Sequence, residues 1–315
     1  MLQGRRVLAI GSGKAGHEAN ALGVAQALGG DYELRRVEPR LVYARLAPYG
    51  PADPIDLKRF LTAPAPQIVI ACGRATVPYA RAIKRTFGRD VFAVMLQDPR
   101  VSRARFDMIW TPAHDLLRGA NVMTTLTSPH PLSAQVLAQW RARPDPRLAD
   151  LPTPRAAIML GGPGGGATYS DVDYARLREA TAQISAQGFA IMATPSRRTP
   201  AAMAAAVRAG AANGFVWDGA GANPYGAMLA LADVALVTGD SANMIGEATA
   251  TGAPVYVFEA QARGAGKIGA MIDALERAGA VRRYRGVIER FHYAPIDSSA
   301  AIAAEIIRRM QLARR

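Results

Sequence analysis

Cysteine is almost absent from this sequence of 315 residues, since Cys72 is the only one. A single cysteine excludes an internal disulfide and leaves no thiolate cluster for a zinc site. Apolar runs of the roughly 18 residues that a membrane-spanning helix needs are also missing. The N-terminus MLQGRRV leads directly into a predicted strand, so we expect neither a signal nor a transit peptide. These absences predict a soluble globular protein of the cytoplasm.

Lysine is scarce too, because only four of the 38 basic residues are lysine and the rest are arginine. The net charge is +13, and residues 1–150 hold 21 Lys and Arg against 12 Asp and Glu. Such a field attracts phosphorylated substrates, nucleic acid or acidic lipid surfaces. No charge run and no interleaving of aromatic with basic residues marks a nucleic-acid groove, so we expect no nucleic-acid partner. The pattern does not predict an oligomeric state.

Several catalytic motifs are missing. The sequence contains no G-x-S-x-G, H-E-x-x-H or G-x-x-x-x-G-K-[ST], which disfavours hydrolase, zinc protease and P-loop NTPase functions. His114 and His130 have no partner at metal-ligand spacing, so we expect neither a metal nor a cofactor. His130 stands between two prolines and is either structural or part of a cleft between domains.

Short apolar runs alternate with alanine-rich amphipathic stretches, the pattern of parallel strands covered by helices. In the first half we predict strands at 7–11, 32–37, 67–73, 91–97 and 108–112, with helices near 17–28, 55–62 and 74–87. In the second half we predict strands at 156–162, 189–195, 214–219, 233–239 and 254–260, with helices near 171–187, 200–210, 224–232 and 242–251. The four prolines of 140–155 predict a linker.

We therefore expect an α/β protein with two Rossmann-like domains, 1–145 and 155–315, that face one another across a cleft. A last helix from Ser299 is apolar on one face and basic near its end. It either docks back on the first domain or contacts a membrane surface, which would make the protein peripheral on the inner face of a membrane.

The first predicted strand ends in a glycine loop. Gly11, Gly13 and Gly16 have the G-x-G-x-x-G spacing of a dinucleotide-binding turn, and Glu38 follows at the distance of the ribose-binding acid. An NAD(P) site is therefore one interpretation. Lys14 and His17 at the start of the helix favour another, because a cation and an imidazole there suit anion contact or proton transfer.

The first strand of the second half also ends in glycines. Gly164, Gly165 and Gly166 in GGPGGG expose backbone amides that can surround a phosphate. After the next strand, TPSRRTP offers hydroxyl and guanidinium donors, of which we single out Ser196 and Arg197; a helix cap is the alternative.

Another polar cluster follows the strand at 233–239. Asp240, Ser241 and Asn243 stand at a helix start, where side chains and free amides can face a phosphate. Glu247 lies one turn further on the same face, where a carboxylate can accept hydrogen bonds from ribose hydroxyls, unless it is a surface carboxylate.

Three residues of the first half complete the candidates. Asp98 follows a strand and either orients an acceptor hydroxyl or starts a turn before its proline. Arg74 and Arg100 either hold an anionic acceptor or form structural ion pairs.

These blocks together resemble a known family. GKAGHEANALGVAQAL, ACGRATVPYARAIKR, LQDPRVSRARFDMIWTPAHD, TSPHPLS, LGGPGGG and NPYGAMLALADVALVTGDSANMIGEATATGAPVYVFE are similar to the mitochondrial fission elongated-mitochondria (ELM) family, which is also widespread in bacteria. The resemblance covers nearly the whole chain, and the composition looks bacterial. The plant member that names the family helps recruit a dynamin-related protein to the outer mitochondrial surface.

The resemblance implies a two-domain glycosyltransferase architecture of the GT-B type. In similar enzymes an N-terminal glycine loop with a histidine faces the acceptor, and E-A-x-x-x-G-x-P grips the nucleotide sugar. Glu247, Ala248, Gly252 and Pro254 match the second pattern, whereas the opening loop lacks the second adjacent glycine of the first. The leading hypothesis is a metal-independent inverting transfer from a nucleotide diphosphate sugar to an anionic or lipid acceptor, with His17 or Asp98 as the base. The alternatives are a non-catalytic scaffold at a membrane surface and an NAD(P)-dependent oxidoreductase.

Overall fold

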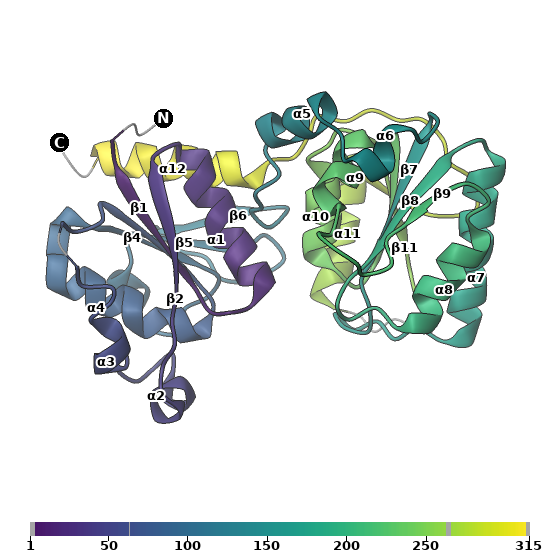
Figure 1. Cartoon of the computed structure of the whole chain (residues 1–315). Helices are drawn as coiled ribbons and strands as arrows, with labels where there is room; N and C mark the ends of the chain where they lie inside the picture. The colour runs from purple at the N-terminus through teal and green to yellow at the C-terminus, as the bar shows by residue number, and fades with distance from the viewer. Residues whose placement is uncertain (1–3, 63, 263–265, 313–315) are drawn as a thin grey trace. The chain divides into compact units, whose positions relative to one another are not determined.

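The chain folds into two α/β units, as the alternation of apolar runs predicts (Figure 1). The computed structural model describes residues 4–62, 64–262 and 266–312. The first unit runs to Ser133 and resumes at Asp297, and the second unit spans Ala134 to Ile296. Each unit contains one six-stranded sheet in which all neighbouring strands are parallel. The predicted α/β class with two Rossmann-like sheets is therefore confirmed.

The first unit has the strand order β2-β1-β3-β4-β5-β6. Its strands are β1 (Arg6–Gly11), β2 (Asp31–Arg36), β3 (Ile68–Cys72), β4 (Phe92–Leu96), β5 (Met108–Pro112) and β6 (Val122–Thr125). Its α-helices are α1 (Ala15–Leu28), α2 (Leu41–Leu46), α3 (Pro54–Leu57), α4 (Val77–Phe87) and α12 (Ser298–Leu312). Three short 3-10 turns accompany them, η1 (Arg74–Thr76), η2 (Gly88–Asp90) and η3 (Arg103–Arg105).

The second unit has the strand order β12-β11-β10-β7-β8-β9. Its strands are β7 (Arg155–Leu160), β8 (Ala190–Pro195), β9 (Gly214–Val216), β10 (Val234–Thr238), β11 (Val255–Phe258) and β12 (Val281–Arg283). Its helices are α5 (Ala134–Ala142), α6 (Pro146–Ala149), α7 (Asp171–Ala186), α8 (Ala201–Gly210), α9 (Tyr225–Leu231), α10 (Ala242–Thr249) and α11 (Lys267–Arg277). The proline-rich stretch 140–155 lies within this unit, because α5 packs against α9.

Strand order determines where each sheet can hold a ligand. In the first unit the first strand, β1, lies between β2 and β3, and in the second unit β7 lies between β8 and β10. The direction of chain progression therefore reverses beside β1 and beside β7. Open parallel sheets bind ligands at such switch points, at the carboxyl ends of the strands. The two glycine loops of the sequence follow β1 and β7.

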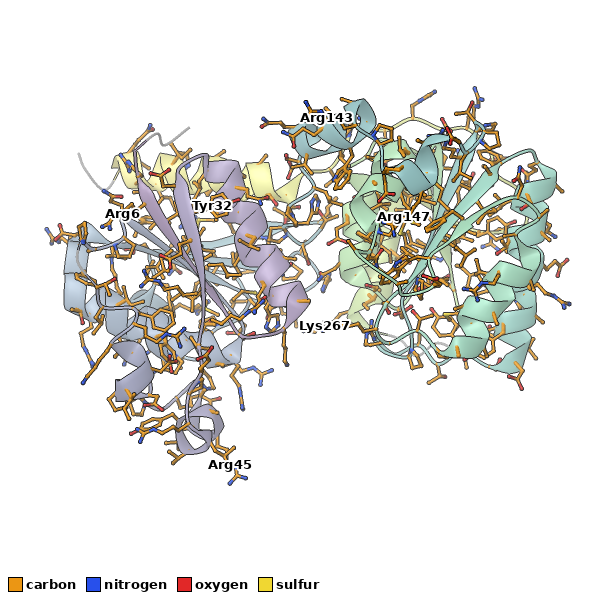
Figure 2. The ribbon with its side chains drawn as sticks, viewed as in Figure 1. Arg6, Tyr32, Arg45, Arg143, Arg147 and Lys267 are labelled. Atoms are coloured by element: carbon orange, nitrogen blue, oxygen red, sulfur yellow. The ribbon has the colours of Figure 1, made fainter. Side chains whose placement is uncertain are left out.

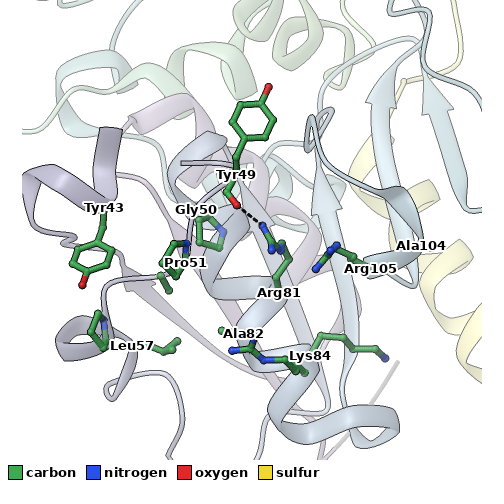
Figure 3. A pocket seen from close by; sticks show the side chains of 14 residues that line it. Tyr43, Tyr49, Gly50, Pro51, Leu57, Arg81, Ala82, Lys84, Ala104 and Arg105 are labelled. Atoms are coloured by element: carbon green, nitrogen blue, oxygen red, sulfur yellow. Dashed lines mark hydrogen bonds between the residues drawn. The ribbon is translucent and has the colours of Figure 1, made fainter. Parts of the chain in front are cut away.

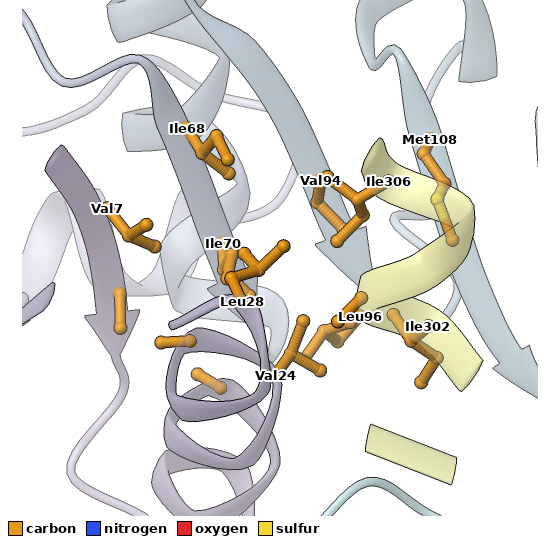
Figure 4. Close-up of a cluster of buried hydrophobic side chains, with 14 of the residues drawn as sticks. Val7, Val24, Leu28, Ile68, Ile70, Val94, Leu96, Met108, Ile302 and Ile306 are labelled. Atoms are coloured by element: carbon orange, nitrogen blue, oxygen red, sulfur yellow. The ribbon is translucent and has the colours of Figure 1, made fainter. Parts of the chain in front are cut away.

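Helix α12 completes the core of the first unit. Its Ile302 and Ile306 are fully buried and lie with α1 residues such as Val24 against one face of the sheet (Figure 4). Ser299 also exchanges two hydrogen bonds with the backbone of His130, at 2.8 and 2.7 Å. The last helix is thus part of the first unit and turns its apolar face to the protein.

Candidate functional site

A buried carboxylate organises the switch point of the second unit. Asp240 is 3% exposed and accepts hydrogen bonds from the Gly162 amide (2.8 Å), the Tyr169 hydroxyl (2.9 Å) and the Arg198 guanidinium (3.2 Å). A Cβ on Gly161 would lie 2.1 Å from Asp240 Oδ2, so only glycine lets the strand pass so close. Burial and the charge of Asp240 raise the pKa of Tyr169 well above its usual value. We predicted Asp240 as a phosphate contact. In the structure its carboxylate instead accepts hydrogen bonds that hold three loops together.

The glycine loop after β7 keeps two backbone amides available. Gly164 and Ala167 exchange reciprocal hydrogen bonds of 3.0 and 2.9 Å, which close a tight turn. Gly165 and Gly166 have φ angles of +60° and +84°, in the left-handed region that favours glycine. A Cβ on Gly165 would also lie 2.3 Å from Ile268 Cδ1. Within the described chain the exposed Gly165 and Gly166 amides donate no hydrogen bond, so both can receive an anion.

The segment after β8 contributes an arginine, but not the one predicted. The Ser196 hydroxyl donates to the Gly161 carbonyl at 2.9 Å, so it holds the glycine loop instead of facing a ligand. Arg197 is exposed, with no partner among the described residues. Arg198 instead donates to the Pro163 carbonyl at 2.9 Å, and its guanidinium, about half exposed, lies against the glycine loop. The sequence offered both arginines as donors, and the prediction singled out Arg197 instead of its neighbour Arg198.

Helix α10 presents the remaining predicted residues. Ser241 caps the helix by accepting from the Met244 amide at 3.4 Å, and Asn243 lies partly exposed in the first turn. One turn further, Glu247 Oε2 accepts a hydrogen bond from the hydroxyl of Tyr225, at the start of α9. This bond orients the carboxylate and leaves Oε1 available to a ligand.

The environment of Glu247 controls its charge. Loss of water around the carboxylate raises the pKa of Glu247 to about 7, although the Tyr225 hydrogen bond opposes the shift. Burial and the Glu247 charge in turn raise the pKa of Tyr225 well above its usual value. A carboxyl group with a pKa near neutrality is typical of functional sites.

The glycine loop of the first unit is arranged differently. Glu18, in the first turn of α1, accepts from the Gly13 amide at 3.1 Å and pairs with Arg36 through two bonds of 2.8 and 2.9 Å. The protein's own carboxylate therefore occupies the loop where the pyrophosphate of a dinucleotide would bind. Lys14 is exposed just before α1, and Gly16 lies in its first turn.

An NAD(P) site also requires an acidic residue that is available to the ribose, and Glu38 does not meet this requirement. Glu38 pairs with Arg59 at 2.9 Å, so its carboxylate is engaged by a neighbouring cation. With a carboxylate already on the loop amide, this geometry disfavours the dinucleotide interpretation.

His17 lies at the switch point between β1 and β3. Its Nδ1 forms a hydrogen bond of 2.8 Å with the Ser12 hydroxyl. Gly73, at the end of β3, approaches so closely that a Cβ there would lie 2.3 Å from His17 Nδ1. Burial and the charge of Lys14 lower the pKa of His17 below 6.5. The lowered pKa favours the neutral imidazole, which is the form that can accept a proton.

The other predicted residues of the first unit lie in nearby loops. The Asp98 carboxylate accepts from the Arg100 amide at 2.9 Å, so it forms the predicted turn, and both side chains are exposed. Gln97 and Arg100 have positive φ angles, 80° and 55°, a backbone conformation that marks strained loops at functional sites. Arg74 follows Gly73 and reaches the Ala44 carbonyl of α2 at 3.4 Å.

Two further histidines, His114 and His130, were considered in the sequence analysis. His130 is buried inside the first unit, 3% exposed, and its ring nitrogens have no hydrogen-bond partner among the described residues. Burial lowers the pKa of His130. His114 lies in the turn after β5. The single thiol, Cys72, is buried, and this burial raises its pKa to about 12. In the described ranges no three His, Cys, Asp or Glu residues are grouped to hold a metal ion.

The fold places the chain in a structural class. It is similar over 98% of its length to the UDP-GlcNAc 2-epimerase of Methanocaldococcus jannaschii, with 99% of that chain covered, a TM-score of 0.57 and 10% identity. The UDP-GlcNAc 2-epimerase of Neisseria meningitidis, solved bound to UDP-GlcNAc, has a TM-score of 0.52 and 10% identity, with 98% and 100% covered. The glycotransferase of kitacinnamycin has a TM-score of 0.50 and 15% identity, with 100% and 95% covered. The protein therefore has a GT-B-like fold.

Sequence comparison identifies the family. The model described as Mitochondrial fission ELM1 matches residues 15–310, and the chain belongs to this family. Mitochondrial fission protein ELM1 of Arabidopsis thaliana is 30% identical over an alignment of 274 positions, which covers 78% of this chain and 64% of that relative. The chain thus spans less than two thirds of the plant protein's length. Among the described residues no helix is long and apolar enough to cross a bilayer.

Proposed function

We propose that this protein is a metal-independent inverting glycosyltransferase whose second unit binds a nucleotide diphosphate sugar. The observation that carries the proposal is the pairing of two features at one switch point. No described residue accepts from the Gly165 and Gly166 amides, and the Glu247 carboxylate is oriented by Tyr225 through Oε2, with Oε1 bound to no described residue. Amides bind phosphate oxygens, and a carboxylate accepts from ribose hydroxyls.

The leaving diphosphate gains negative charge as the glycosidic bond breaks. The glycine loop amides, the amides that begin α10 and the guanidinium of Arg198 stabilise this charge, the role that a metal ion has in other enzymes. Arg197 extends into solvent beside Arg198 and adds to the positive field. Asn243 contributes a neutral polar contact in the first turn of α10.

The first unit receives the acceptor. His17 takes the proton of the acceptor hydroxyl, the oxygen attacks the anomeric carbon from the face opposite the nucleotide, and the diphosphate leaves with the bonding electrons. Neutral His17 supports this role better than Asp98, whose carboxylate is engaged in its own turn. Lys14, Arg74 and Arg100 attract an anionic acceptor.

A second candidate is a non-catalytic scaffold at a membrane surface. The similarity to Mitochondrial fission protein ELM1 supports it, because a protein can keep a nucleotide-sugar fold as an interaction platform. In that case the second switch point binds no nucleotide, or binds one without transfer.

Thermal unfolding with UDP, GDP, CMP, NAD or NADP tests the proposal. A nucleotide present at a hundredfold its dissociation constant stabilises the protein by about 2.7 kcal/mol. We expect one nucleoside diphosphate to stabilise the wild type and Glu179→Ala, an exposed control, and to stabilise Glu247→Ala and Glu247→Gln much less. Stabilisation by NAD(P), or by no nucleotide, would overturn the proposal, and binding without hydrolysis or transfer of a matching nucleotide sugar would favour the scaffold.

A further inference from the structure

The segment between β2 and β3 exposes an unusual number of large apolar side chains. Five of the eleven exposed large hydrophobic residues in the described chain lie within 15 positions: Leu41, Val42, Leu46, Tyr49 and Ile55, 48 to 69% exposed. Helix α2 contains no buried residue at all. A helix without a buried residue gains little stability from its own unit, and exposed apolar clusters of this kind mark interaction surfaces.

A cationic pocket adjoins these side chains. It has a volume of about 630 Å³, and Tyr43, Tyr49 and Leu57 line it together with residues of α4 and η3 (Figure 3). Arg81, Arg85 and Arg105 all line it as well. Burial and the charges of Arg105 and Arg85 lower the pKa of Arg81. Three positively charged side chains therefore lie close together in this pocket. In addition, the buried Nε of Arg81 has no hydrogen-bond partner among the described residues.

The nearby carboxylates do not neutralise these arginines. Asp53 is buried and accepts from the amide and guanidinium of Arg40, and Asp56 is buried and pairs with Arg59. On α4, Lys84 pairs with Asp107 at 2.7 Å. In the described part of the chain no acidic partner is recorded for Arg81, Arg85 or Arg105. The pocket therefore presents uncompensated positive charge beside exposed apolar groups.

We propose that this α2–α4 surface, made of the five apolar residues and the three arginines, docks on a membrane that contains anionic phospholipids. The arginines bind lipid phosphates in the pocket, and the apolar side chains enter the headgroup and acyl boundary. Arg45 extends away from the tip of α2 and adds a further cation (Figure 2). The combination favours a bilayer over a soluble anion, because a free phosphate would leave α2 exposed.

The position of the surface is consistent with a membrane acceptor. Arg74, next to Gly73 and His17, donates to the Ala44 carbonyl of α2, so the apolar helix adjoins the candidate acceptor site. Docking itself does not depend on the proposed transferase activity, since vesicle binding requires no nucleotide sugar. The two proposals can therefore fail separately.

Cosedimentation of the full chain with vesicles tests the docking. We expect binding to vesicles of equal parts phosphatidylcholine and phosphatidylglycerol, and little binding to phosphatidylcholine alone. Each cation near an anionic surface raises the partition constant about fivefold, so Arg85→Glu with Arg105→Glu lowers this constant by about 25-fold or more. Leu41→Ser with Val42→Ser lowers it by roughly tenfold through lost insertion.

Matched substitutions on the second unit serve as controls. Arg178→Glu with Arg208→Glu reverses the charge of two exposed arginines, as the double variant does, and Val172→Ser changes a side chain that is 55% exposed. Both are expected to bind vesicles as the wild type does, and circular dichroism checks that all variants are folded. Equal loss in the controls, or wild-type binding in both double variants, would overturn the proposal. Stabilisation by inorganic phosphate without vesicle binding would assign the pocket to a soluble anion, and a dimer that Leu41→Ser with Val42→Ser dissociates would assign α2 to a second copy.

Discussion

The two switch points contain the same parts, but they differ in which backbone amides the carboxylate binds. Each has a glycine loop after its first strand and a buried carboxylate beside it. In the first unit Glu18 binds the Gly13 amide, which lies at the point where an anion would enter. In the second unit Asp240 accepts from the Gly162 amide, and the Gly165 and Gly166 amides have no acceptor among the residues that the structure describes. Glycine spacing alone therefore does not indicate a phosphate site; the decisive property is whether the amides are already occupied.

The largest effect is expected from Asp240→Ala. The Gly162 amide, the Tyr169 hydroxyl and the Arg198 guanidinium would lose a shared buried acceptor. We expect a loss of about 3 to 4 kcal/mol in the free energy of unfolding of the second unit, measured by urea unfolding. Asp150→Ala, an exposed control, is expected to change it by less than about 0.5 kcal/mol. Equal values for the two variants would show that Asp240 does not organise the loops.

The next largest effect on stability is expected from a substitution at the first switch point. Gly73→Ala would place a Cβ 2.3 Å from His17 Nδ1, at a residue with a φ of +95°. We expect a loss of about 2 kcal/mol in the free energy of unfolding, together with a shifted NMR titration of His17. Gly279→Ala is the matched control, because Gly279 has a φ of +72° and nothing within 4 Å of its Cβ position. If both variants lose equally, backbone strain explains the effect and the contact with His17 does not.

The sequence predicted the sheets better than the sites. The alternation of short apolar or β-branched runs with helical stretches predicted ten of the strands, but β6 and β12 were missed because VMTT and VRR are short and only partly apolar. The predicted helix at 55–62 ends at Leu57, and α2 was missed because its apolar side chains face outward and show no core periodicity.

Side-chain roles at the sites depend on distant partners. Asp240 and Gly162 are 78 positions apart, so no local pattern shows that this carboxylate is already occupied. Arg197 and Arg198 are neighbours with the same chemistry, and only the turn after β8 decides which one lies against the glycine loop. Glu247 was predicted from helical spacing and from the E-A-x-x-x-G-x-P pattern, whereas its partner Tyr225 lies on another helix.

A pH dependence sharpens the contrast between the units. The pKa of Glu247 is about 7, and ribose hydroxyls donate to its ionised form. Nucleotide affinity should therefore rise about tenfold from pH 6 to pH 8, as the carboxyl group loses its proton. Isothermal titration of the wild type measures this rise. In Glu247→Gln we expect weaker binding without the slope, and a slope that persists there would assign the titration to another group.

The smallest effect concerns the carboxylate that fills the first loop. The Arg36 hydrogen bond lowers the pKa of Glu18 below 4.5, so its stabilisation is complete above that pH and is lost as the pH falls through the lowered value. Glu18→Ala should cost the first unit about 1 kcal/mol at pH 6, and the difference from the wild type should shrink at pH 3. Urea unfolding at both pH values measures it, with Glu33→Ala, whose exposed carboxylate pairs with Arg35, as the control. A cost that is the same at pH 3 and pH 6 would mean that Glu18 acts through packing. The two loops would then differ in shape and not in which group occupies their amides.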